Sequence, residues 1–338
     1  MTKVTNPAAS IRRGFDFLNR IANKPEGFDS YGSLLTCCFA LISATARDTS
    51  LRRLAKSRAH KLARRWKRRH RVIPADVTAG QLLDFVMVRY ALGRIGVNDP
   101  ALNGQIRSAV ERFSVEDLLG FDALRESPPN DLPYPCDCGL QNQRGRKFCK
   151  QCKKRLEIQT RYRVWMEALA DTYVSERCGQ ILGASYLDVL KWLPQMRPYP
   201  VLADDDYDSL HDAIYAVTHV VYTLNDYGTY KLSPGWLPHE FTLLKTNVAG
   251  ACEREDPEVL GELLDSLRGF GLARTHPLIR RGTEYLLAAQ NSDGSWGDPE
   301  EEDISTLCHT TWTAIDGLRA YAWRGKRLSV PSIVNRKS

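Results

Sequence analysis

Residues 280–321 read RRGTEYLLAAQNSDGSWGDPEEEDISTLCHTTWTAIDGLRAY, and the fold is predicted from this stretch outward. Apolar residues recur at helical spacing up to Ala289, so the stretch begins as a helix. Residues 291–294 then interrupt it, because Asn, Asp and Gly accept the left-handed backbone that ends a helix. After an acidic loop, residues 305–306 can cap a second helix that we expect to reach about Trp323.

Part of this hairpin resembles the QW motif of triterpene cyclases, through Gln290, Gly294 and Trp296. In that family the Gln closes the end of an outer helix and the Trp lies near it, which ties neighbouring hairpins of an α/α toroid together. The helix beginning near Cys308 resembles the last inner helix of protein prenyltransferase β subunits, where the His at the place of His309 is a zinc ligand. The resemblance implies a toroid, and it leaves the reaction open because the superfamily includes cyclases, prenyltransferases and non-enzymes.

Helices of two kinds alternate along the rest of the chain. Residues 31–46 are apolar on all sides and are expected to be buried, whereas residues 50–70 have one apolar stripe on a basic helix. The pattern gives about six hairpins at roughly 40 to 50 residues each, which is typical of a helical-hairpin array. We therefore predict an all-α fold, an (α/α)6 toroid whose buried helices form an inner ring around a cavity. The expected helices are residues 6–22, 31–46, 50–70, 79–95, 100–112, 161–178, 185–193, 206–227, 238–252, 257–270, 276–290 and 304–323.

Four parts are expected along the chain. Residues 1–128 form the first half of the toroid, 129–157 a small insert, 158–326 the second half, and 327–338 a C-terminal tail. The insert carries two cysteine pairs, Cys136 with Cys138 and Cys149 with Cys152. Four thiolates at this spacing can surround a zinc ion, so we predict a basic zinc ribbon with a structural role.

The composition fits a protein with a sizeable core. The chain has 338 residues, 43% of them hydrophobic, and a net charge of +7. Its first residues lack the apolar segment of a signal peptide, and its longest apolar run, at about residues 34–46, is too short to span a bilayer. Nine cysteines without a secretion signal favour reduced thiols over disulfides, so a cytoplasmic protein is expected.

The eighth expected helix carries polar residues among apolar ones. Asp208, Asp212, Tyr215 and His219 fall on one stripe at about 100° per residue, and His211 lies beside them. A buried polar stripe is costly unless it is paired, bound to a metal or facing a wet cavity. We therefore predict that it lines the cavity, with His211, Asp212, Tyr215 and Asp208 as acid–base or orienting groups.

Neighbouring inner helices offer ligands for a second metal. His219 and His309 come from two of them, and Glu262 or Asp265 comes from the helix between. Two histidines and a carboxylate leave open positions on Zn²⁺ or Fe²⁺ for water or substrate. The sequence thus predicts a metal-dependent enzyme that acts on a small, largely apolar substrate, isoprenoid-like or another natural product.

Two other functions stay open. The acidic run Asp204–Asp208 predicts a metal-free cyclase of the class II terpene type, started by an Asp, although its order departs from that family's motif. The zinc ribbon and the basic helix at residues 50–70 predict instead a module that binds nucleic acid or a protein partner. The polar groups are also open to a simpler interpretation, as hydrogen-bonded core residues and helix caps.

Overall fold

The protein is all-helical in the computed structural model, which describes residues 6–201, 207–301 and 303–335. Across these residues, isolated bridges are the sole β structure. The predicted all-α class is confirmed. The α-helices are α1 (Pro7–Asn23), α2 (Pro25–Thr45), α3 (Thr49–Arg69), α4 (Ala79–Arg94), α5 (Pro100–Val110), α6 (Val115–Leu119), α7 (Arg161–Arg177), α8 (Tyr186–Leu190), α9 (Tyr207–Leu224), α10 (Pro238–Glu253), α11 (Pro257–Gly269), α12 (Pro277–Ala288) and α13 (Ile304–Leu318). Three short 3-10 helices are η1 (Leu193–Met196), η2 (Pro234–Trp236) and η3 (Ser332–Asn335).

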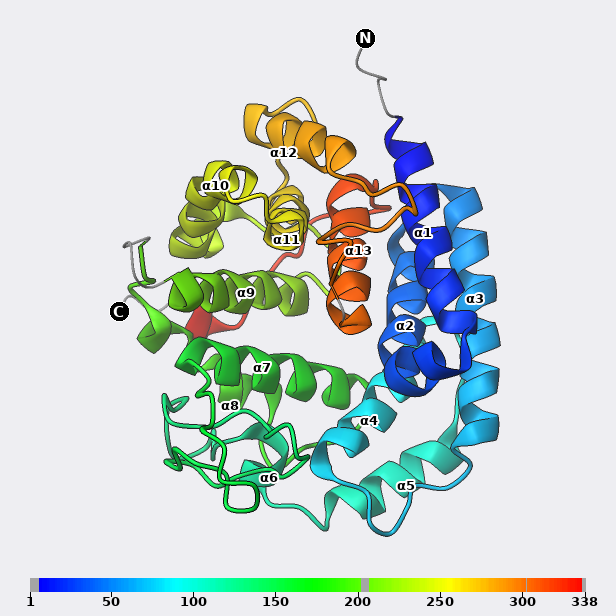
Figure 1. The fold of residues 1–338 in the computed structure, drawn as a ribbon. Coiled ribbons are helices and arrows are strands. Elements are labelled where there is room, and N and C mark those ends of the chain that lie inside the picture. The colour runs from blue at the N-terminus through cyan, green and yellow to red at the C-terminus, as the bar shows by residue number, and fades with distance from the viewer. Residues whose placement is uncertain (1–5, 202–206, 302, 336–338) are drawn as a thin grey trace.

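Six helices form a closed inner ring (Figure 1). Going round it, α2 packs on α4, α4 on α7, α7 on α9, α9 on α11 and α11 on α13, while α13 returns to α2. The other helices lie outside them: α1 packs on α13 and α2, α3 on α2 and α4, and α5 on α4. On the opposite side, α6 and α8 pack on α7, while α10 and α12 pack on α11. This arrangement is the predicted (α/α)6 toroid.

Inner helices are buried because their sequences are apolar round most of the helix. In α2, every residue from Leu35 to Ser43 is buried, as its unbroken apolar run predicts. In α11, every residue from Val259 to Gly269 is buried, including the carboxyl groups of Glu262 and Asp265. Buried carboxyl groups on a helix that packs on both neighbours have to find partners or face a cavity.

The residues after α12 join the last hairpin to the first helix. Gln290 donates from Nε2 to the backbone oxygen of Ser10 in α1 at 2.9 Å, and its Oε1 accepts a hydrogen bond from Arg13. Trp296 is fully buried, and a Cβ on Gly14 of α1 would come within 2.6 Å of its ring. These contacts hold the ends of the toroid together where the ring closes.

Two helix ends differ from the sequence prediction. Helix α2 begins at Pro25, not near Tyr31, because Pro25 occupies the first helical turn, where its missing N–H costs nothing. Helix α13 ends at Leu318 and does not reach Trp323, since Arg319 is extended and Tyr321 pairs with Ala46 in an isolated bridge. The five-residue helix α6 was not predicted.

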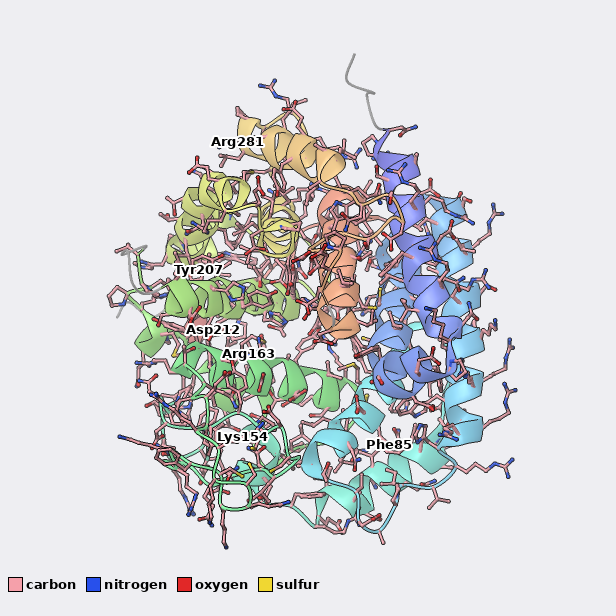
Figure 2. All side chains as sticks on the ribbon, viewed as in Figure 1. Phe85, Lys154, Arg163, Tyr207, Asp212 and Arg281 are labelled. Atoms are coloured by element: carbon pink, nitrogen blue, oxygen red, sulfur yellow. The ribbon has the colours of Figure 1, made fainter. Side chains whose placement is uncertain are left out.

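The predicted insert lies between α6 and α7, and it has an apolar cluster of its own. Cys136, Cys149 and Leu156 are buried together, with Leu140 packed against them. Lys154, labelled in Figure 2, belongs to this insert, at the edge of the molecule away from α12. No helix among the described residues is long and apolar enough to cross a membrane.

Candidate active site and metal centre

The four cysteines of the insert come together in the fold. The Sγ atoms of Cys136 and Cys152 are 3.4 Å apart, and those of Cys138 and Cys149 are 3.6 Å apart. All four sulfur atoms lie within 4.8 Å of one another, so the group can hold a metal ion.

Tight turns bring these cysteines together. Gly139 follows the first pair with a φ of 82°, and Lys153 follows the second with a φ of 63°, so both turns enter the left-handed region. The backbone N–H of Cys152 hydrogen-bonds the Cys149 sulfur and, against the effect of burial, helps to lower the pKa of that thiol to about 6. A lowered pKa favours the thiolate, which is the form that binds a metal. The pKa of Cys136 shifts the other way, to about 12, because the hydrogen bond from the Cys138 backbone is outweighed by contacts with the other cysteines and by burial.

A cavity of about 180 Å³ lies inside the ring. It is larger than the roughly 150 Å³ apolar cavity that accommodates benzene in an engineered core, so it has room for a small organic molecule. Helices α2 and α4 supply an apolar wall, and α9, α11 and α13 supply a polar one. The apolar wall consists of Leu34, Cys37, Leu41, Leu83, Val86 and Met87.

His219 lines the polar wall as a neutral ring fixed at one nitrogen. Its Nδ1 lies 2.9 Å from the backbone oxygen of Tyr215. Because that oxygen can only accept, Nδ1 carries the ring hydrogen and donates a hydrogen bond to it. Burial, with His309 as the next contribution, lowers the pKa of His219 to about 3. The lone pair of Nε2 is therefore free for a ligand in the cavity.

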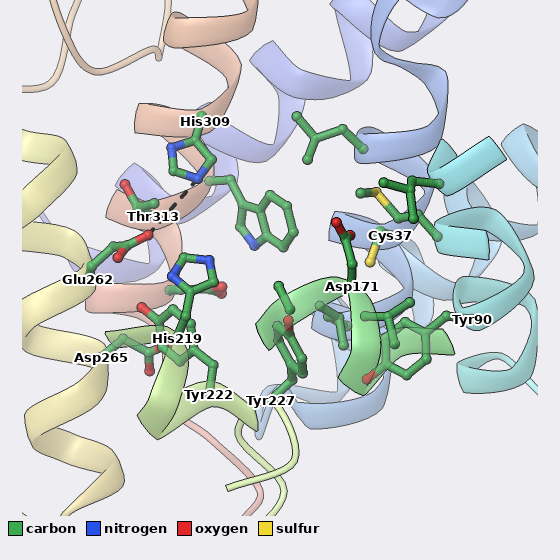
Figure 3. A pocket seen from close by; sticks show the side chains of 18 of the residues that line it. Cys37, Tyr90, Asp171, His219, Tyr222, Tyr227, Glu262, Asp265, His309 and Thr313 are labelled. Carbon is green, nitrogen blue, oxygen red and sulfur yellow. Dashed lines mark ion pairs between the residues drawn. The ribbon is translucent and has the colours of Figure 1, made fainter. Parts of the chain in front are cut away.

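His309 is fixed in a similar way by a carboxylate. Its Nδ1 lies 2.6 Å from Oε1 of Glu258. Its Nε2 lies 4.0 Å from Oε1 of Glu262, the ion pair dashed in Figure 3. Burial opposes a charge on the ring, but the bond to Glu258 and the charges of Glu258 and Glu262 together raise the pKa of His309. A carboxylate on Nδ1 orients a histidine and makes its other nitrogen a better metal ligand.

Of the two predicted carboxyl ligands, Glu262 is the one beside His309. Its side chain is 2% exposed, it accepts a hydrogen bond from Thr218, and burial raises its pKa to about 7. Asp265 also lines the cavity, but its carboxyl group bonds to Tyr321 and lies near the pair of Asp316 and Arg319. Burial raises the pKa of Asp265 to about 7 as well.

The cavity ligands are spaced more widely than the cysteines. Within the described ranges, the four cysteines form the single group of three or more possible ligand residues whose atoms all lie within 4.8 Å of one another. His219 therefore lies farther than that from His309 or from Glu262. A metal in the cavity would have to draw His219 toward the other two.

The remaining predicted acid–base residues of α9 lie mostly outside the cavity. Asp208 is exposed, and Asp212 accepts a hydrogen bond from Thr160 at 2.7 Å, which fastens α9 to the start of α7. The ring of His211 lies 4.7 Å from that of Tyr215, tilted by 35°, and does not line the cavity. Tyr215 is the one of the four next to the site, because its hydroxyl donates to Glu258. The stripe was predicted to face one cavity, but its first turn faces α7 and the surface.

The acidic run proposed as a cyclase acid is only partly described. Residues 204–206 of this run, Asp204, Asp205 and Asp206, lie outside the described residues. Its last member, Asp208, is exposed at the start of α9 and is not part of the cavity wall.

Sequence reasoning missed Asp171, which lines the cavity from α7. Burial, with the nearby charges of Glu167 and Asp84, raises its pKa to about 8. The sequence could have indicated Asp171, because it is a carboxyl group between the apolar residues Ala170 and Val174 of a helix predicted to be an inner one.

The basic side chains of α3 extend from the outer edge of the toroid in Figure 2. Several of them already have partners inside the protein. Lys67 forms an ion pair with Asp99 at 2.7 Å, and the guanidinium of Arg65 lies 3.9 Å from the centre of the Phe28 ring. These contacts use part of the basic surface to hold α3 against its neighbours.

The sequence matches no protein-family model, and it matches no curated protein either.

Proposed function

We propose that this protein is a metal-dependent enzyme that acts on a small, largely apolar molecule inside the toroid. The observation that carries the proposal is the orientation of His219, His309 and Glu262. Both histidines line the cavity and are held at Nδ1, and Nε2 of His309 lies 4.0 Å from Glu262. Two imidazoles and one carboxylate form a donor set that suits zinc or iron(II).

The surrounding walls support an apolar substrate. The aliphatic residues of α2 and α4 provide a surface on which a hydrocarbon body can pack, with the proposed ligands on the other side. An isoprenoid-like molecule or another natural product fits a cavity with an apolar wall on one side and the proposed ligands on the other. The family proposal, a terpene cyclase or prenyltransferase-like toroid, is supported by the six-helix inner ring and by the contacts of Gln290 and Trp296.

Each residue of the site has a distinct task under this proposal. A bound metal would polarise a substrate oxygen or activate a water molecule. Glu258 holds His309 in one orientation, while its second oxygen accepts a hydrogen bond from Thr310 at 2.8 Å. Tyr215, which also donates to Glu258, stacks 6.0 Å from the His309 ring and restricts its movement.

For the insert we propose a structural zinc ion. Four thiolates are typical of closed zinc sites, which leave no position for substrate. The ribbon would therefore stabilise the insert and take no part in the reaction.

Cobalt(II) titration of the metal-free protein tests the proposal, because thiolate ligands give intense charge-transfer bands whereas imidazole and carboxylate ligands do not. We expect two kinds of spectral change, and His219→Ala should remove only the weaker, thiolate-free one. Charge-transfer bands alone in the wild type would contradict a metal in the cavity.

A second enzyme function, proton transfer without a metal, is favoured by one observation. The pKa of Glu262 is raised to about 7, so this carboxyl group can both give and take a proton near neutral pH. Activity that survives chelation and is lost in Glu262→Gln would select this function.

A further inference from the structure

Asp171 is a cavity carboxyl group without a partner. It lies on α7, and no hydrogen bond or ion pair joins it to another residue in the described part of the chain. The other carboxyl groups of the cavity are bonded, Glu262 to Thr218, Asp265 to Tyr321 and Asp316 to Arg319. Asp171 is half-buried, so its unpartnered carboxylate carries a desolvation cost that an oppositely charged ligand in the cavity would offset.

Aromatic side chains surround the space that this carboxyl group faces. Figure 3 shows Asp171 and Tyr90 on one side of the cavity, opposite His309 and Glu262, and Tyr227 also lines the cavity. The hydroxyl of Tyr90 is buried and has no hydrogen-bond partner in the described structure. Aromatic faces attract organic cations, so the rings of Tyr90 and Tyr227 suit an ammonium group.

The acidic groups that line the cavity favour a cation over an anion, because a bound cation would stabilise their ionised forms, which burial disfavours. Four carboxyl groups face it, and among the described residues Arg319 is the one guanidinium that does so. Arg319 is already paired with Asp316. Arg94 lies 5.9 Å from the Tyr90 ring, but its charge is paired with Asp226 at 3.1 Å.

The nature of the cation follows from what Asp171 lacks. His219, His309 and Glu262 lie on the other side of the cavity (Figure 3), so a metal ion at Asp171 would lack the ligands proposed for the cavity metal. An ammonium group needs one carboxylate and an aromatic surrounding, and both are present.

We propose that the cavity binds an organic ammonium group at Asp171, flanked by Tyr90 and Tyr227. The ligand is an apolar amine, whose hydrocarbon body packs against α2 and α4. The inference deepens the proposed function and rests on it in one respect, since it takes the bound amine to be the substrate. The charged group would lie on the opposite side of the cavity from His219, His309 and Glu262.

Calorimetric binding of cyclohexylamine and cyclohexanol at about pH 9 tests this, because the two probes share one body and differ in charge. At that pH the amine is still protonated, and Asp171, whose pKa is raised to about 8, is ionised. Wild type is expected to bind the protonated amine at least about tenfold more tightly than the alcohol. Asp171→Asn should abolish that preference, whereas Asp76→Asn, which changes an exposed carboxylate between α3 and α4, should keep it. Equal binding of the two probes by wild type, no binding of the amine, or an unchanged preference in Asp171→Asn would overturn the proposal.

The His309→Ala variant separates this inference from the proposed enzyme. If this variant no longer binds cobalt in the cavity but still prefers the amine, the ammonium site stands. Its residues are then distinct from the metal ligands. If wild type binds no cavity cobalt yet prefers the amine, the metalloenzyme falls and the ammonium site remains. Thermal melting of each variant confirms that it is folded.

Discussion

Each cavity histidine is fixed at Nδ1, and Nε2 of His309 lies 4.0 Å from the carboxyl group of Glu262. His219 is held by the backbone of its own helix, through Tyr215, and His309 is held by Glu258 from the neighbouring helix. Their surroundings push the two pKa values in opposite directions, down for His219 and up for His309. Different protonation of two similar residues is typical of a site prepared for chemistry.

Replacing Glu258 by Gln is predicted to weaken the cavity metal without touching its ligands. The variant loses the carboxylate that orients His309, and loss of such a partner lowers metal affinity by about tenfold to a hundredfold. Cobalt titration measures this, with the exposed Glu284→Gln of α12 as the control. Equal cobalt affinity in the two variants would show that Glu258 does not support a metal site.

Asp171→Asn is predicted to stabilise the fold, and more so in alkaline solution. The pKa of this carboxyl group is raised to about 8 in the folded protein. The folded state therefore binds more protons than the unfolded state between about pH 4 and pH 8, and stability falls as pH rises through that window. The amide has no such loss, so we expect a gain of at least about 1 kcal/mol near pH 9 and little near pH 4. Thermal melting at the two pH values measures it, and a gain independent of pH would be evidence against a buried, titrating Asp171.

At the scale of elements, the position of Glu262 depends on close contact between α11 and α13. Gly261 and Gly317 allow the two backbones to touch, because a Cβ on Gly261 would lie 2.5 Å from the backbone carbon of Thr313. The backbone of α13 cannot move aside as a flexible side chain could, because both helices are tightly packed.

Gly261→Ala is predicted to destabilise the protein by about 2 kcal/mol or more, since the added methyl group forces the helices apart. The matched control is Gly104→Ala in α5, where a Cβ would meet nothing within 4 Å. That change should be neutral or stabilising by up to about 1 kcal/mol, as expected for alanine in a helix. Urea unfolding of both variants measures the difference, and similar stabilities would mean that the helices do not meet as closely as described.

The sequence was most informative about elements and least informative about side chains whose role depends on another helix. Apolar periodicity placed the inner helices, so His219, Glu262 and His309 could be predicted to line one cavity. Glu258 orients His309 across two helices, and no pattern within one helix encodes such a pair. Asp212 was assigned to the cavity because periodicity gives a face of a helix but not the neighbour that covers it.

At the scale of the whole molecule, the toroid and the cysteine insert have separate apolar clusters. The insert contributes Cys136, Cys149 and Leu156, while the toroid has one continuous core. A metal in the insert would therefore stabilise the insert and leave the ring largely unaffected.

The double variant Cys149→Ser, Cys152→Ser is predicted to lose the order of the insert and keep the toroid. Two of four sulfur ligands are removed, so the metal and the short turns around it are lost. Circular dichroism should retain the helical signal, and limited proteolysis should cut within residues 129–157. Loss of most of the helical signal would show instead that the toroid depends on the insert.

The central claim is that the cavity holds a metal, and metal content per chain by native mass spectrometry tests it most directly. The wild type, the Cys149→Ser, Cys152→Ser variant, and that variant with His309→Ala added are compared after incubation with zinc or iron(II). The account predicts two ions, one ion and none, in that order. One ion in the wild type and none in the cysteine variant would contradict it, because the insert would then be the single metal site.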